Sequence, residues 1–109
     1  MIASKILRMH TIYHFTTRQE WEWALGTGIH VSPSLYDEGF IHCCTSDQVK
    51  HISRRHARDS AETLLLEIDP RALRSQLVYE WSKSHEQTFP HIYGPINTDA
   101  VIGARPLPS

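Results

Sequence analysis

Three histidines are the residues of this chain best suited to chemistry: His14, His42 and His91. Each lies beside aromatic or apolar residues, near an expected turn or strand end. Near neutral pH an imidazole can act as general acid, general base, hydrogen-bond partner or metal ligand. If folding brings the three rings together, they would line one cleft with acid–base capacity. If folding keeps them apart, each is an ordinary hydrogen-bonded structural histidine.

The segment Gly39–Ser46 carries His42 and is expected to organise the fold. In an extended strand, Phe40, His42 and Cys44 would share one face. Thr45–Gln48 then fits a capping box, which predicts a helix over 46–57. A helix N-terminus there would offer free backbone N–H groups to an anion.

Metal and thiol chemistry are alternatives for the same residues. Three histidines and a water would make a catalytic zinc site, but Cys43 and Cys44 would point to opposite faces of a strand. We therefore name no metal ligand. A Cys–His nucleophilic pair also stays open. No C-x-x-C, G-x-S-x-G, H-E-x-x-H, P-loop or G-x-G-x-x-G motif is present.

Composition limits the class of protein and of partner. The 109 residues suit one domain, expected over 10–109 after a short extension over 1–9. With a net charge of −1, long nucleic acid is not expected as a partner. No apolar run is long enough for a membrane span. Two adjacent free cysteines suit a reducing compartment, so a cytoplasmic protein is expected.

The expected elements alternate between strand and helix and then become mainly strands. A capping box at Thr17–Glu20 predicts a helix that Gly26 and Gly28 end. The order favours an α+β fold with two helices packed on a sheet. Strands are predicted at 10–15, 29–31, 40–44, 63–69, 77–81 and 100–104. A helical turn is predicted at 71–73. The remaining segments are predicted to be a loop at 33–39, a polar connector at 82–88, a stiff segment at 89–95 and a turn at 97–99.

The second predicted helix has a basic outer side. Lys50, Arg54, Arg55 and Arg58 would lie there. Such a cluster is either a solvated helix face or a surface that steers a phosphate group towards the protein.

Several segments together resemble the DUF952 family of small, mostly bacterial proteins. The resemblance covers residues 10–108 and keeps the order of the segments. They are Ile12–Phe15, Thr17–Trp21, Ser34–Leu35, Glu38–Cys43, Leu65–Pro70 and Phe89–Ile96.

This resemblance implies an ADP-ribosyltransferase-like fold with a split β-sheet, two main helices and a cleft that holds NAD in relatives. It implies binding roles for His14, Ser34, Phe40 and Tyr93, with His14 on the adenine-side ribose. His42 and His91 are the catalytic candidates it implies.

The identity of the catalytic acid leaves the activity open. Many transferases of this fold use a late-chain glutamate, for which Glu80 and Glu86 are the acidic candidates near His91. The expected function is binding of NAD or a related nucleotide, with transfer of ADP-ribose. The alternatives are a non-catalytic nucleotide- or small-molecule-binding module, or a metal- or thiol-dependent enzyme.

Overall fold

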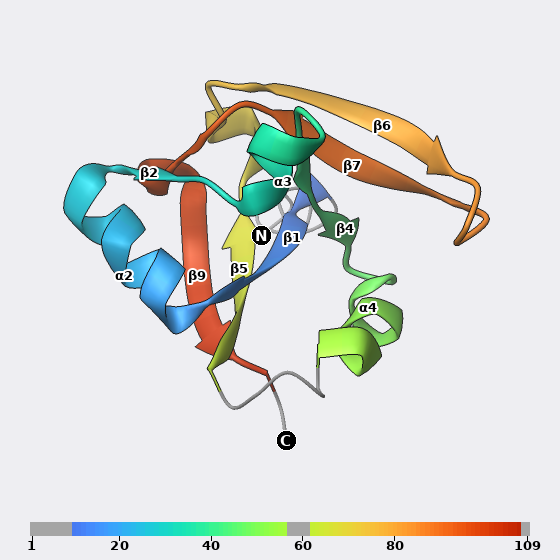
Figure 1. Ribbon diagram of the computed structural model, residues 1–109, viewed down its shortest axis with the longest axis horizontal. Coiled ribbons are helices and arrows are strands. Elements are labelled where there is room, and N and C mark those ends of the chain that lie inside the picture. The colour runs from blue at the N-terminus through green and yellow to red at the C-terminus, as the bar shows by residue number, and fades with distance from the viewer. Residues whose placement is uncertain (1–9, 57–61, 108–109) are drawn as a thin grey trace, which may run out of the picture.

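The computed structural model describes residues 10–56 and 62–107, which form an α+β fold (Figure 1). The predicted extension over 1–9, Arg58 and the predicted end of the second helix at 57 lie outside these ranges. The strands are β1 (Ile12–Thr17), β2 (Ile29–His30), β3 (Ile41–His42), β4 (Cys44–Thr45), β5 (Thr63–Ile68), β6 (Gln76–Ser82), β7 (Gln87–Tyr93), β8 (Ile96–Asn97) and β9 (Val101–Pro106). The helices are α2 (Arg18–Thr27), α3 (Pro33–Asp37) and α4 (Val49–His56), with 3-10 turns η1 (Pro70–Ala72) and η2 (Thr98–Ala100).

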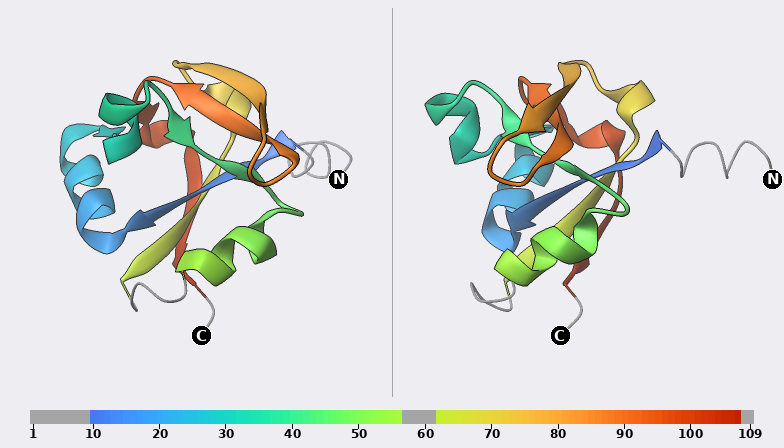
Figure 2. Two further views of the ribbon diagram at one scale, coloured as in Figure 1. Left: turned by 45° about the vertical axis from the view of Figure 1, so that its right-hand side comes forward. Right: turned by 90° about the vertical axis from the view of Figure 1, so that its right-hand side faces the viewer.

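The strands form three antiparallel sheets. The largest has the order β4-β1-β5-β9, the second has the order β3-β7-β6, and β2 pairs with β8. Figures 1 and 2 show the β6–β7 hairpin lying across one end of the four-stranded sheet. In the part of the chain that is described, no helix is both long enough and apolar enough to cross a membrane.

Burial along the strands follows the sequence pattern. In β1, the buried side chains of Ile12, His14 and Thr16 alternate with half-buried ones. In β5, four successive residues from Thr63 are buried, and because successive side chains point to opposite faces, both faces of this part of the strand are covered. The predicted burial of β5 on both faces is confirmed.

The predicted continuous strand over 40–44 is wrong in one respect, since it breaks at Cys43. The N–H group of Cys43 donates to the carbonyl of Pro90 in β7, whereas Cys44 pairs with Tyr13 of β1. The chain therefore changes sheets between these two cysteines. The alternation of faces is lost at this step, and both cysteines are buried.

The predicted N-cap of α2 is confirmed, whereas α4 begins three residues later than predicted. Thr17 accepts the N–H of Glu20, and Gly28 ends α2 with a positive φ of 88°. The prediction that Gly26 also ends this helix is wrong, since Gly26 lies inside α2. At the second site the side-chain carbonyl of Gln48 accepts the N–H of Thr45 at 2.9 Å. This contact closes a turn before the helix, so α4 begins at Val49 instead of 46.

Two segments predicted to be irregular are partly regular. Residues 33–37 form α3, because Pro33 occupies its first turn, where a missing N–H costs nothing. The predicted connector over 82–88 is shorter than expected: β6 continues to Ser82 and β7 begins at Gln87, so the turn covers residues 83–86. The turn between them places Glu86 at a φ of 53°.

The core lies between the four-stranded and three-stranded sheets. Its fully buried members come from β1, β3, β5, β7, β8 and η2. Burial of these aliphatic side chains is the main favourable term that holds the two sheets together. They are Ile12, Ile41, Leu66, Ile68, Ile92, Ile96 and Ala100, together with Cys43.

We expect Leu66→Ala to destabilise the protein by about 2–5 kcal/mol, because it leaves a cavity where two sheets pack. Leu66 is fully buried in β5. Leu25→Ala is the matched control: this leucine is 61% exposed on α2, and its loss should change stability by about 0.5 kcal/mol or less. Urea unfolding measures both. Equal effects of the two substitutions would contradict this placement of the core.

Candidate functional site

A cleft of about 600 Å³ lies between β1, β3, α3 and the β6–β7 hairpin. This volume is in the range of small-molecule sites. Its lining combines aromatic and aliphatic side chains with imidazoles, hydroxyls, thiols and one carboxylate. The lining residues are Tyr13, His14, Phe15, Ser32, Pro33, Ser34, Glu38, Phe40, His42, Cys43, Cys44, Ile52, Trp81, Ser82, Ser84, His85, Phe89 and His91.

Five of the six predicted site residues line this one cleft: His14, Ser34, Phe40, His42 and His91. They come from β1, α3, the residue before β3, β3 itself, and β7. The sixth, Tyr93, does not line it. Tyr93 approaches the site only indirectly, through its ring contact with Phe40 and its hydrogen bond to Glu80. The binding and catalytic roles of all six stay predictions.

His14 is held in one tautomer by the backbone. Its Nδ1 lies 2.6 Å from the carbonyl oxygen of His42, and a carbonyl can only accept, so Nδ1 carries the hydrogen. Nε2 is left as an acceptor, and it is buried without a hydrogen-bond partner among the described residues. Burial, then the nearby His30, lowers the pKa of His14 to about 3, so the ring is neutral at pH 7.

Behind His14 lies a second buried imidazole, His30. The two ring centroids are 5.1 Å apart, and His30 is fully buried. Neither of its nitrogens has a hydrogen-bond partner in the described part of the chain. Burial lowers its pKa to about 4. The sequence predicts a brief strand at His30 and no role in the site. Nothing in the local pattern reveals that the ring of His30 packs behind β1.

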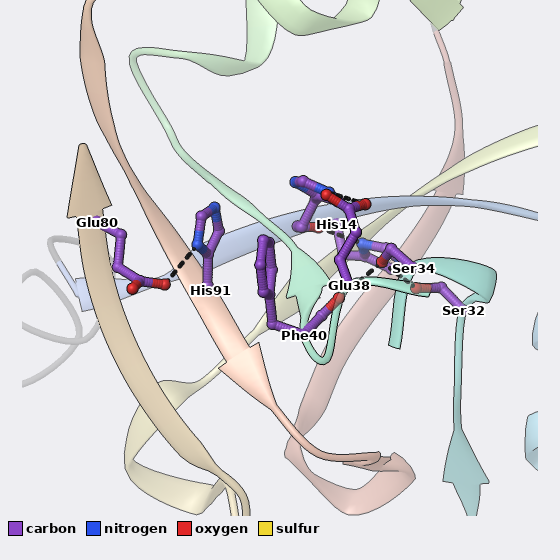
Figure 3. Close-up of polar contacts among 8 residues, drawn as sticks. His14, Ser32, Ser34, Glu38, Phe40, Glu80 and His91 are labelled. Carbon is purple, nitrogen blue, oxygen red and sulfur yellow. Dashed lines mark hydrogen bonds and ion pairs between the residues drawn. The ribbon is translucent and has the colours of Figure 1, made fainter. Parts of the chain in front are cut away.

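Each of the two catalytic candidates contacts a glutamate, and Figure 3 shows the pair formed by Glu80 and His91. Glu38 Oε2 lies 2.9 Å from His42 Nε2 at the exposed side of the cleft. Glu80 Oε1 lies 2.8 Å from His91 Nδ1 and also accepts the hydroxyl of Tyr93. Hydrogen bonds from Tyr93 and then His91 hold the pKa of Glu80 below its ordinary value.

Phe40 joins the two histidines into one aromatic group. Its ring stacks on His91 at a centroid distance of 4.0 Å and an angle of 18°. It also meets the edge of His42 at 4.9 Å, and the two imidazole centroids are 5.4 Å apart. This stack restricts ring rotation at His91.

Two serines line the cleft beside this group. The hydroxyl of Ser34 donates to the carbonyl of Phe40 at 2.8 Å, which closes the loop after α3. The hydroxyl of Ser32 lies 3.1 Å from that of Ser34. Because Ser34 uses its hydrogen on the backbone, Ser32 donates to Ser34 or to a ligand.

The thiols in the cleft are poor nucleophiles. Burial raises the pKa of Cys44 to about 12, and it raises that of Cys43 well above its usual value. Both are therefore protonated at neutral pH, whereas catalytic cysteines act as thiolates. Among residues 10–56 and 62–107, no group of three or more histidine, cysteine or acidic side chains is arranged to hold a metal ion.

Sequence reasoning missed Glu38 as the acidic group of the cleft. It lies in the segment before the central strand, four residues from His42, but this spacing indicates proximity only within a helix. Glu80 was recognised as a candidate near His91. Strand pairing explains its contact, since Val78 lies opposite His91 and Glu80 is the next residue on that face of β6.

The buried imidazoles predict a loss of stability in acid. Between pH 6.5 and about 4 the unfolded chain binds a proton at His30 that the folded chain excludes. Stability therefore falls as pH decreases below 6.5, by about 1.4 kcal/mol per pH unit for each such histidine.

His30→Leu should remove about 1.4 kcal/mol per pH unit from the slope of unfolding free energy between pH 6 and 4.5. Urea unfolding at several pH values measures this slope. The same comparison above pH 7 is the control, because neither state binds a proton at position 30 there. If the slope of the unfolding free energy between pH 6 and 4.5 is unchanged, the folded protein accepts a proton on His30.

Comparison with known proteins identifies a family and solved structures similar to this chain. The family model described as "Protein of unknown function (DUF952)" matches residues 15–104. No curated protein matches the chain. The crystal structure of protein CC0527 from Caulobacter crescentus is similar at a TM-score of 0.80 and 28% identity, over 90% of this chain and 86% of that one. Its solution NMR structure gives a TM-score of 0.75 at 29% identity, over 91% and 85%. The chain is a member of the DUF952 family.

Proposed function

We propose that the protein binds NAD or a related nucleotide in the histidine-lined cleft and transfers the ADP-ribose portion of it. The observation that carries this proposal is the convergence of His14, His42 and His91 on one cleft that also contains the carboxylate of Glu38. The proposal includes an ADP-ribosyltransferase-like fold. The separation of the strands into a four-stranded and a three-stranded sheet supports that assignment.

Binding of a sugar is supported by the unused polar atoms of the cleft. Nε2 of His14 is a buried acceptor without a partner, and such an atom is costly unless a ligand supplies a donor. A ribose hydroxyl is a donor of this kind. The hydroxyl of Ser32 and the aromatic side chains of the cleft supply further polar and stacking contacts.

The carboxylate of Glu38 in the cleft supports transfer of ADP-ribose. Breaking the bond between nicotinamide and ribose builds positive charge on the sugar. A carboxylate beside the sugar stabilises that charge or orients a ribose hydroxyl. Glu38 is the carboxylate that lines the cleft, and its hydrogen bond to His42 holds it there. A module that only binds its ligand has no need of this group.

Binding can be tested by thermal shift with NAD, ADP-ribose, adenine nucleotides and divalent metal ions. We expect NAD and ADP-ribose to raise the melting temperature, by an amount that grows with ligand concentration. His14→Asn is the informative variant: an asparagine amide can still donate to the His42 carbonyl, but it has no counterpart of Nε2. This variant should fold and lose the shift. A melting temperature that no nucleotide changes would refute the proposal.

Catalysis can be tested by release of nicotinamide from NAD, followed by NMR. Glu38→Gln should lower the rate by about 100-fold, because the amide keeps the shape but not the charge. Glu22→Gln on α2, outside the cleft, is the control and should leave the rate unchanged. Binding of NAD without nicotinamide release by the native protein would identify a non-catalytic module instead.

A further inference from the structure

We infer that Glu80 is a positioning residue that fixes His91 as a general base, and that the cleft therefore activates an O–H nucleophile, either water or a hydroxyl group. The inference about the nucleophile deepens the proposed function and depends on it. The inference about the state of His91 depends only on the contacts of His91 and can be tested without any nucleotide.

The first step is the geometry of the two strands. Glu80 on β6 and His91 and Tyr93 on β7 project from the same face of the three-stranded sheet. One carboxylate oxygen of Glu80 accepts both His91 Nδ1, at 2.8 Å, and the Tyr93 hydroxyl. In Figure 3, Nδ1 of His91 is turned towards Glu80, and the other ring nitrogen lies on the far side of the ring.

The second step is the tautomer. A carboxylate has no hydrogen to give, so the hydrogen of this bond belongs to Nδ1 of His91. The hydrogen bond from Tyr93 helps to keep Glu80 ionised, since it lowers the pKa of that carboxyl group. In a neutral ring, Nε2 then carries a lone pair and no hydrogen.

The third step is the placement of the ring. His91 is 9% exposed, lines the cleft and stacks on Phe40, so it cannot turn without losing both the stack and the bond to Glu80. Within the described part of the chain no hydrogen bond engages Nε2. The charged or titratable groups around the ring are Glu80 on β6, Tyr93 on β7, and His42 on β3, which is itself bonded to Glu38.

The chemistry of the nucleophile follows from this arrangement. A base with a free lone pair is useful for a nucleophile that must lose a proton as it attacks, as water and hydroxyl groups must. In hydrolysis of NAD, the water oxygen bonds to the ribose carbon and its proton passes to Nε2. The carbon–nitrogen bond breaks, and its electron pair leaves with neutral nicotinamide. The imidazolium formed on His91 is stabilised by Glu80 and then returns its proton to solvent.

Two measurements on the free protein test the state of His91. Long-range ¹H–¹⁵N spectra should show the tautomer with hydrogen on Nδ1. Carbethoxylation by diethyl pyrocarbonate, mapped by mass spectrometry, should modify His91. Glu80→Gln should slow that modification by about threefold or more, because nucleophilic reactivity follows basicity. Glu22→Gln, the same change on α2 outside the cleft, should leave the rate unchanged.

A third measurement tests the role of His91 in turnover. In His91→Asn the amide can keep the bond to Glu80 but offers no base at the position of Nε2. We expect nicotinamide release to fall by about 100-fold while the thermal shift with NAD persists. Glu80→Gln should lower kcat by about 10-fold with little change in KM.

The outcomes separate the two proposals. Hydrogen on Nε2 of His91, or equal carbethoxylation rates in the native protein and Glu80→Gln, would overturn this inference even if NAD binds. Turnover that survives His91→Asn would also overturn it. If no nucleotide binds, the proposed function fails, and the spectra and modification rates still decide the role of Glu80.

Discussion

The hydrogen bond from His14 to the backbone of His42 is the contact on which the arrangement of the cleft depends. It joins β1 of the four-stranded sheet to β3 of the three-stranded sheet, across 28 residues of sequence, at 2.6 Å. The same contact sets the tautomer of His14 and leaves Nε2 without a partner. Because the carbonyl belongs to His42, the position of one imidazole is tied to the backbone of another.

The cleft contains buried polar groups that would lower the stability of an ordinary hydrophobic core. The rings of His14 and His30 are buried and neutral, and together they leave three nitrogens without partners among the described residues. Unsatisfied buried polar atoms cost stability, and they concentrate at functional sites, where a ligand can satisfy them. The aliphatic cluster between the sheets offsets this cost.

In His42 and His91, a carboxylate occupies one ring nitrogen and leaves the other available to a ligand. Glu38 engages Nε2 of His42 and Glu80 engages Nδ1 of His91, so the two neighbouring rings present different nitrogens. Their different exposure adds to this contrast. The side chain of His42 is 55% exposed, whereas that of His91 is 11% exposed and covered by Phe40. Two histidines of identical chemistry thus have different environments, which is how one site can assign them separate tasks.

The sequence alone determined the family, the α+β class, the capping of α2 by Thr17 and Gly28, and the burial of β5. These features depend on local pattern and on the order of segments, both of which are visible in one chain. The sequence also named five residues that line the cleft. Tertiary structure decided the change of sheet at Cys43, the pairing of Glu38 and Glu80 with their histidines, and the burial of His30. Those features depend on strand pairing and on packing between sheets, which join residues far apart in the chain and leave no periodic signal within it.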